Sequence, residues 1–299
     1  MGQLDKHVVT LRAGGLEAAL SPAVGGSLLR LSLDNTDLMR CAPDGSDDPL
    51  DMASFPLVPY ANRIADGRFM FDGQDHQLPL NFGDHPHSIH GFGWQTAWTA
   101  SETDDSTALL VHRHDGDAGW PWAYRAEQHV ALTPWQLSIS LSVTNIGDAP
   151  MPVGLGFHPY FLMDEATTVH FDADGLWLST PDMLPAIHAP ADRLGNWSIA
   201  TPVAGDSLID NAFTGWNGIA TVRRGDAVRL TLTASDAPYL HFYRPPGSGF
   251  FCLEPVSHMP DAINRGGMPV VSPGQSTRLS MIIAVDKDDQ TLPKSASIA

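Results

Sequence analysis

The sequence predicts an all-β protein folded as a large antiparallel β-sandwich. Three observations lead to this fold class: apolar and polar residues alternate along many short segments, turn residues separate those segments at close intervals, and no ten-residue window has a convincing helical period. Alternation with a period of two places apolar side chains on one face of a strand and polar side chains on the other. Many strands with almost no helix favour a sandwich, although periodicity alone leaves a barrel open.

The predicted strands run along the whole chain. The clearest are 137–145, 228–234 and 278–286, in which apolar residues occupy every second position. Further strands are predicted, in chain order, over 7–13, 16–22, 27–33, 69–78, 108–114, 124–132 and 167–173. Gly, Pro, Asp and Asn are concentrated between these segments, as turns require. Short helical turns are predicted within 34–43 and 258–267.

A single domain is predicted for the 299 residues. No composition shift, Pro/Ser-rich linker or internal repeat divides the chain, and all-β domains of more than about 200 residues are common. We expect the folded core to span about 7–287 and the residues after it to form a polar C-terminal tail.

The composition excludes several classes of partner. The net charge is −17, and a field of this sign repels nucleic acid and anionic lipid. No stretch approaches the length of a membrane span, and the N-terminus lacks the apolar core of a signal peptide, so we expect a cytoplasmic protein without membrane contact. The two cysteines, Cys41 and Cys252, lie far apart and indicate no disulfide framework. We expect Cys252 to be a buried apolar side chain rather than a nucleophile.

Three histidines gather in the segment HPHSIHGFGW, residues 85–94. Their spacing is compatible with a metal site of the cupin type, but a proline interrupts the run and no further ligand follows at close spacing. We therefore interpret His85 and His87 as loop residues. His90 is different, because the glycine after it allows close backbone approach, and Phe92 and Trp94 could form the wall of a pocket.

Three further segments carry residues suited to acid–base or binding chemistry. In GLGFHPYF, aromatic neighbours desolvate His158 and move its pKa, as a proton-transfer group requires, whereas the alternative is a core histidine. In FCLEPVSHMPDAIN, Glu254 follows an apolar run, and burial would raise its pKa; the alternative is a salt-bridged glutamate. In NRIADGRF, Asn62 precedes Arg63, whose planar guanidinium suits hydroxyl or carboxylate recognition, unless it is a surface arginine paired with Asp66.

Together, NRIADGRF, HPHSIHGFGW, GLGFHPYF and EPVSHMPDAIN resemble the four signature blocks of the aldose 1-epimerases (galactose mutarotases), in that family's order. The blocks span residues 55–264. The resemblance implies the galactose mutarotase-like supersandwich, a large antiparallel β-sandwich that the alternation indicates independently. It also implies interconversion of the α and β anomers of a free aldose, without a cofactor, a metal or a covalent intermediate.

The resemblance further implies a role for each matching residue. Glu254 is the base that takes the proton of the C1 hydroxyl, and His158 is the acid that protonates the ring oxygen, if their environments bring both pKa values near 6–7. The sugar-binding residues that it implies are Arg63, His90, Asp210, Asn62, Trp94 and Tyr160. Asp210 is the best match in SLIDNAF, with Asp206 as its neighbour in the sequence.

Two departures from the family pattern leave the substrate open. The chain is shorter than the galactose mutarotases, and it reads IHGFGW where those enzymes typically have a second glycine directly after His-Gly. Galactose, glucose, xylose and arabinose all remain candidates, for a monomer or a homodimer. One alternative is a hexose-6-phosphate 1-epimerase whose cationic pocket would use Arg63, Arg68 and Arg244. The other is a sugar-binding module without catalysis.

Overall fold

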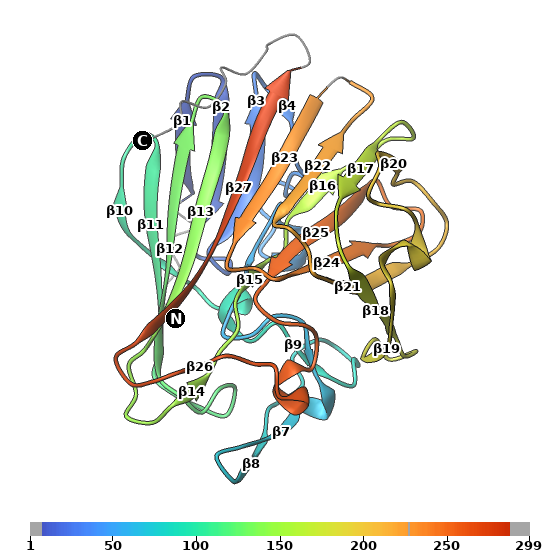
Figure 1. Ribbon diagram of the computed structural model, residues 1–299. Coiled ribbons are helices and arrows are strands. Elements are labelled where there is room, and N and C mark those ends of the chain that lie inside the picture. The colour runs from blue at the N-terminus through green and yellow to red at the C-terminus, as the bar shows by residue number, and fades with distance from the viewer. Residues whose placement is uncertain (1–7, 227, 288–299) are drawn as a thin grey trace, which may run out of the picture.

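The larger of two main antiparallel sheets forms one face of the protein (Figure 1). The computed structural model describes residues 8–226 and 228–287. In order across the larger sheet, the strands are β10 (Thr99–Thr103), β11 (Thr107–His114), β12 (Tyr124–Thr133), β13 (Gln136–Asn145), β27 (Ser276–Lys287), β23 (Val228–Ser235), β22 (Ile219–Arg223), β17 (Thr168–Phe171) and β20 (Thr201–Pro202).

Strict alternation explains why these segments form a sheet with one buried face. Along β13 every second residue is buried, from Leu137 to Asn145. The register with β27 places Ile139 opposite Met281 and Leu141 opposite Leu279, so that apolar pairs stack on the same face. Cross-strand pairs of this kind stabilise a sheet together with the burial of the face.

Two smaller units form the opposite layer. The second sheet contains, in order, β19 (Pro185–Pro190), β18 (Gly175–Ser179), β21 (Ile209–Thr214), β24 (Tyr239–Arg244), β25 (Phe250–Val256), β15 (Gly156–Phe157) and β5 (Pro56–Leu57), with β16 (Tyr160–Leu162) also paired to β25. Beside it lies the sheet of β1 (Val9–Ala13), β2 (Leu16–Ser21), β3 (Ser27–Leu33) and β4 (Thr36–Asp37). Isolated bridges at Leu28–Ser54 and Met39–Phe161 connect the two units.

The core lies between the layers. Phe171 of β17 packs edge-on against Phe213 of β21 and Phe242 of β24, with ring centroids 5.0 and 6.1 Å apart. β1 and β2 contact β12 at the other end of the larger sheet. Two layers of antiparallel sheet that share an apolar interior constitute a β-sandwich, so the predicted fold class is confirmed.

The remaining elements are short and lie at one end of the sandwich or in its loops (Figure 1). The two-stranded units are β6 (Arg63–Ile64) with β9 (Ser88–Ile89), β7 (Arg68–Phe71) with β8 (Gln74–Gln77), and β14 (Met151–Pro152) with β26 (Val270–Val271). The single 3₁₀ turns are η1 (Pro49–Asp51), η2 (Ala65–Gly67), η3 (Gly93–Gln95), η4 (Ala191–Leu194) and η5 (Ala262–Arg265). In the described part of the chain, no helix is long and apolar enough to cross a membrane.

Most element predictions are confirmed, and the exceptions have physical reasons. The segment 69–78 is a hairpin of two strands around Asp72–Gly73. The helical turn predicted within 258–267 is η5, whereas 34–43 contains a tight turn and β4 instead of a helix. The second sheet was largely missed because β21 and β25 are buried on nearly every residue, which removes the alternation. The single domain stays a prediction, and the C-terminal tail lies outside the described residues.

Candidate active site

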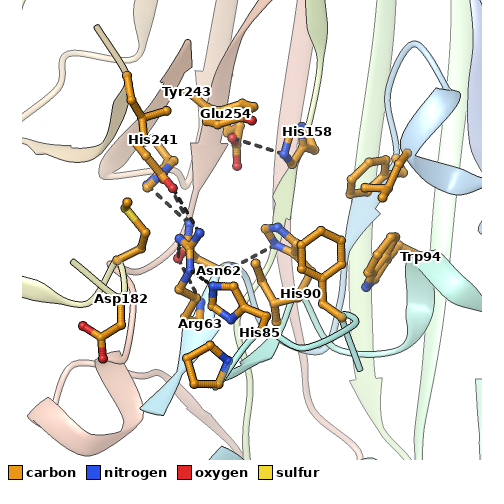
Figure 2. A pocket seen from close by; sticks show the side chains of 18 of the residues that line it. Asn62, Arg63, His85, His90, Trp94, His158, Asp182, His241, Tyr243 and Glu254 are labelled. Carbon is orange, nitrogen blue, oxygen red and sulfur yellow. Dashed lines mark hydrogen bonds and ion pairs between the residues drawn. The ribbon is translucent and has the colours of Figure 1, made fainter. Parts of the chain in front are cut away.

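A cavity of about 590 Å³ opens beside β21, β24 and β25 of the second sheet. Its volume lies in the usual range for small-molecule sites. All eight residues predicted from the sequence line this cavity, and most of them are labelled in Figure 2: Asn62, Arg63, His90, Trp94, His158, Tyr160, Asp210 and Glu254. The structure therefore brings together side chains that are up to 192 positions apart in the chain.

The register of β25 places a histidine on each side of Glu254. Gly156 pairs with Val256 and Tyr160 pairs with Cys252, so His158, halfway between them, falls opposite Glu254. On the other flank β24 pairs His241 directly with Glu254. Side chains that face each other across neighbouring strands lie on the same side of the sheet, and this side faces the cavity.

Glu254 and His158 form a buried pair at the centre of the site (Figure 2). The distance between His158 Nε2 and Glu254 Oε1 is 3.4 Å. The imidazole is held between the rings of Phe55 and Tyr160, with centroids 4.7 and 4.6 Å away. His158 Nδ1 and Glu254 Oε2 are buried and have no hydrogen-bond partner among the described residues. Buried polar atoms are normally satisfied, so this pair has unused hydrogen-bonding capacity.

Burial moves the pKa values of the pair in opposite directions. Desolvation, reinforced by the charge of Asp210, raises the pKa of Glu254 well above its usual value. Desolvation, with His241 and Arg40 nearby, lowers the pKa of His158 to about 3. The condition that both pKa values approach 6–7 is therefore not met for His158, because burial disfavours the charged form of either group. Burial thus favours the neutral form of both groups, the carboxylic acid of Glu254 and the uncharged imidazole of His158.

The polar side of the cavity is a second connected network, centred on Asp210. His241 Nε2 lies 2.6 Å from Asp210 Oδ1, and Arg63 Nη2 donates to Asp210 Oδ2 at 3.0 Å. Arg63 Nη1 also donates to the side-chain oxygen of Asn62 at 3.1 Å. Burial by itself raises the pKa of Asp210, but the contacts with His241 and Arg63 outweigh burial and hold the pKa well below its usual range. Asp210 is thus a fixed anion.

The alternative interpretation of Arg63 as a surface residue paired with Asp66 is wrong, because Arg63 is buried and pairs with Asp210. Asp206 is exposed and does not line the cavity.

His90 is held in one orientation by the backbone of Asn62. Its backbone N–H donates to the Asn62 carbonyl at 2.9 Å, and its Nδ1 accepts the Asn62 backbone N–H at 3.0 Å. Because burial lowers the pKa of His90 well below its usual value, the ring is neutral and its proton lies on Nε2. Gly91 has φ +66, and a Cβ there would lie 2.4 Å from the Val58 carbonyl oxygen. Trp94 Nε1 donates to the Gly91 carbonyl and closes the turn.

The three histidine rings of the segment 85–94 do not converge on one point. His85 lines the cavity and accepts from Arg63 Nε at 3.3 Å. His87 is buried, accepts the backbone N–H of Asp66, and its Nε2 lies 3.2 Å from Asp182 Oδ2. Each ring thus has a different partner, which agrees with supporting loop residues and counts against a metal site in this run.

Sequence reasoning missed His241 and Tyr243 on β24 and Phe55 before β5. The only signal for the first two is their alternation within YLHFYR, and the sequence does not show which strand they face. Phe55 stacks on both His158 and Trp94. Its part in holding the imidazole follows only from the tertiary fold.

The cationic pocket considered for a phosphosugar does not form. Arg68 pairs with Asp75 on the exposed β7–β8 hairpin. Arg244 donates to the carbonyl oxygens of Val203 and Ser207 and does not line the cavity. Arg63 is the one arginine among the lining residues, and Asp210 neutralises it.

Comparison with known proteins agrees with the four sequence blocks and with the arrangement of residues in the cavity. The family model of the aldose 1-epimerases matches residues 7–284. The chain belongs to the aldose 1-epimerase family. An Escherichia coli K12 relative, "Uncharacterized protein YphB", is 33% identical over 294 residues, covering 93% of this chain and 99% of that protein.

Two further comparisons, one with a sequence and one with a solved structure, extend the match. A galactose mutarotase of Rattus norvegicus is 30% identical over 261 residues, which cover 72% of this chain and 73% of the relative. A crystal structure of an Escherichia coli K12 protein superposes with a TM-score of 0.87 at 31% identity, covering 94% of this chain and 99% of the other. The fold is the galactose mutarotase-like supersandwich that the resemblance implied.

Proposed function

We propose that the protein is an aldose 1-epimerase that interconverts the α and β anomers of a free aldose. The observation that carries the proposal is the buried Glu254–His158 pair, with 3.4 Å between Nε2 and Oε1, on the wall of a sugar-sized cavity. Family membership supports the same reaction class. The individual roles of Glu254 and His158 are those that the family resemblance implies, and the 3.4 Å contact between the two groups supports a transfer of protons between them.

The reaction needs one group that accepts the proton of the C1 hydroxyl and one that donates a proton to the ring oxygen. Transfer of a proton from Glu254 to His158 produces the carboxylate and the imidazolium that this division requires. Sugar hydroxyl groups that donate to Glu254 would stabilise its carboxylate form in the bound state. In this proposal the charged pair forms when the sugar binds.

The chemical step then opens the ring. Glu254 takes the C1 hydroxyl proton, the C1–ring oxygen bond breaks, and His158 protonates the ring oxygen. Rotation about the C1–C2 bond turns the aldehyde over. His158 then accepts the proton back, Glu254 returns its proton to the new C1 hydroxyl, and the opposite anomer forms. No net proton is gained or lost.

The remaining polar groups supply hydrogen bonds for the sugar hydroxyls. His90 Nε2–H is a fixed donor, and Arg63, Asn62 and Asp210 offer further donors and acceptors. Trp94 and Tyr160 present aromatic surface to the cavity, which suits the apolar faces of a sugar ring.

Polarimetry or proton NMR of the anomeric signals tests the proposal with freshly dissolved α-D-glucose, α-D-galactose and α-D-xylose. We expect wild type to accelerate mutarotation, and Glu254→Gln and His158→Asn each to reduce kcat by about 10²–10⁴-fold, the usual contribution of one proton transfer. Glu127→Gln on β12 and His112→Asn on β11 are matched controls outside the cavity.

Each alternative outcome has a meaning. Saturable sugar binding without acceleration by wild type would contradict the proposal and favour the sugar-binding module. Acceleration that survives in both active-site variants would show that the Glu254–His158 pair is not the catalytic pair.

A further inference from the structure

A third side chain with a metal-binding atom lies beside the Glu254–His158 pair. Cys252 is two residues before Glu254 on β25, so both side chains leave the strand on the same face. One ligand atom from each of His158, Cys252 and Glu254 lies within 4.8 Å of the other two. Cys252 is a free cysteine, and β16 and β24 place Tyr160 and Tyr243 on either side of it.

The cluster is buried and incompletely satisfied. Glu254 is 1% exposed, Cys252 is fully buried and His158 is 7% exposed. Glu254 Oε2, one of its potential ligand atoms, is buried and has no hydrogen-bond partner among the described residues. The mechanism proposed above uses His158 and Glu254 and gives Cys252 no role.

Imidazole nitrogen, thiolate sulfur and carboxylate oxygen together form a ligand set that suits Zn²⁺ and similar thiophilic divalent ions. One thiolate and one carboxylate would balance the charge of a divalent ion, which matters in a site that is removed from water. Three protein ligands also leave one coordination position open, and His158 and Glu254 both line the cavity through which an ion and its fourth ligand can enter.

We propose that His158, Cys252 and Glu254 form a binding site for a thiophilic divalent cation such as Zn²⁺, and that a bound ion excludes the sugar. The second half rests on the proposed function, because the ion would occupy both groups that are assigned to proton transfer. The first half does not depend on any catalytic activity. The net charge of −17 favours the approach of a cation.

Co²⁺ is the spectroscopic probe for the first half, since thiolate coordination gives a charge-transfer absorption that carboxylates and imidazoles alone do not give. The chain has two cysteines, so single substitutions show which of them supplies the thiolate. We expect wild type and Cys41→Ala to show the band and Cys252→Ala to lose it. His85→Asn, which removes a histidine of the 85–94 run, should keep the band.

Zn²⁺ inhibition of mutarotation tests the second half. We expect inhibition that is competitive with the aldose, and a half-inhibitory concentration that rises by about tenfold or more in Cys252→Ala, because even indirect changes around a metal typically cost 10–100-fold in affinity. The inhibition of each variant is measured relative to its own rate without added metal. If Cys252→Ala does not fold, His158→Asn and Glu254→Gln serve for the Co²⁺ titration, and both should lose the band.

Two results would overturn the inference: a Co²⁺ spectrum without thiolate character in wild type, or equal Zn²⁺ inhibition of wild type and Cys252→Ala. A protein that shows the Co²⁺ band but does not accelerate mutarotation would support the metal site while contradicting the proposed function. The two proposals can therefore fail separately.

Discussion

At the scale of single residues, His241 connects the polar network of the cavity to the acid–base pair. It hydrogen-bonds to Asp210 through Nε2 and faces Glu254 across the β24–β25 register. Asn62 Nδ2 lies within 3.5 Å of both ring nitrogens. From this position, we expect His241 to hold Asp210 in place for sugar binding and to take no part in proton transfer.

His241→Ala should therefore impair binding more than catalysis. A hydrogen bond to a charged group contributes about 1.5–3 kcal/mol, so we expect the KM for the preferred aldose to rise by roughly tenfold to a hundredfold with a smaller change in kcat. His241→Gln, whose amide nitrogen can reach Asp210, should recover much of the loss. Steady-state kinetics of both variants provide the check, and an effect confined to kcat would contradict a positioning role.

His258 is the clearest case of a residue whose burial couples stability to pH. Its Nε2 accepts the Ala61 backbone N–H and its Nδ1 lies 2.8 Å from the Met259 carbonyl oxygen, so the fold requires the neutral ring. Burial lowers its pKa from 6.5 to about 4. In the unfolded chain His258 is thus protonated below about pH 6.5, whereas in the folded chain it is protonated only below about pH 4.

The predicted consequence is a loss of stability on acidification. The contribution of the neutral His258 ring to the free energy of unfolding is fully present above about pH 6.5. It is lost as the pH falls from 6.5 to about 4. A pKa difference of this size corresponds to about 3 kcal/mol. Urea unfolding between pH 7 and 4 should show a shallower decline for His258→Gln than for wild type. Identical slopes would show that His258 does not dominate this window.

At the scale of elements, the loop from β9 to η3 is shaped by backbone conformation as much as by side chains. His90 and Gly91 both have positive φ, and Gly91 lies against the Val58 carbonyl where no Cβ fits. This close approach places His90 beside Asn62 and turns Trp94 into the cavity wall. The backbone geometry at position 91 therefore requires a glycine.

Gly91→Ala should disturb this loop. Both the positive φ and the 2.4 Å clash oppose an alanine, so we expect a loss of about 1–3 kcal/mol in stability and a larger loss in sugar affinity. Gly73→Ala is the matched control: it has φ +73 but nothing within 4 Å, at the tip of the β7–β8 hairpin. The control should lose some stability and keep the wild-type KM, measured by thermal melts and kinetics.

The elements also show where the sequence is informative. Strands of the larger sheet such as β13 have one solvated face and were predicted from alternation. β21 and β25 have few exposed residues and gave no such signal, although they carry Asp210 and Glu254. The residues at functional positions were found through motifs, while the strands that hold them were largely missed.

At the scale of the whole molecule, charge should separate free sugars from phosphorylated ones. The chain has a net charge of −17, and in the cavity Asp210 already pairs with Arg63. A phosphate dianion would find no free cationic partner among the described lining residues. Long-range repulsion between like charges is screened by salt.

Glucose-6-phosphate should therefore be a poorer substrate than glucose, by about tenfold or more in kcat/KM. Added salt should improve its turnover through screening while leaving that of glucose nearly unchanged. Anomer exchange followed by NMR at low and high ionic strength tests both statements. Preference for the phosphosugar would restore the hexose-6-phosphate alternative.

The sequence by itself determined the fold class and the identity of the eight predicted cavity residues, because alternation reports one-sided burial, seven of the eight lie in the four contiguous motifs, and Asp210 lies in the further segment SLIDNAF. Only the tertiary structure decided what these residues touch. The register of β25 with β16 and β24 sets His158 and His241 on either side of Glu254, and burial then gives His158 a pKa far from neutrality. Both depend on segments distant in the chain, and pairing and desolvation arise only when those segments meet.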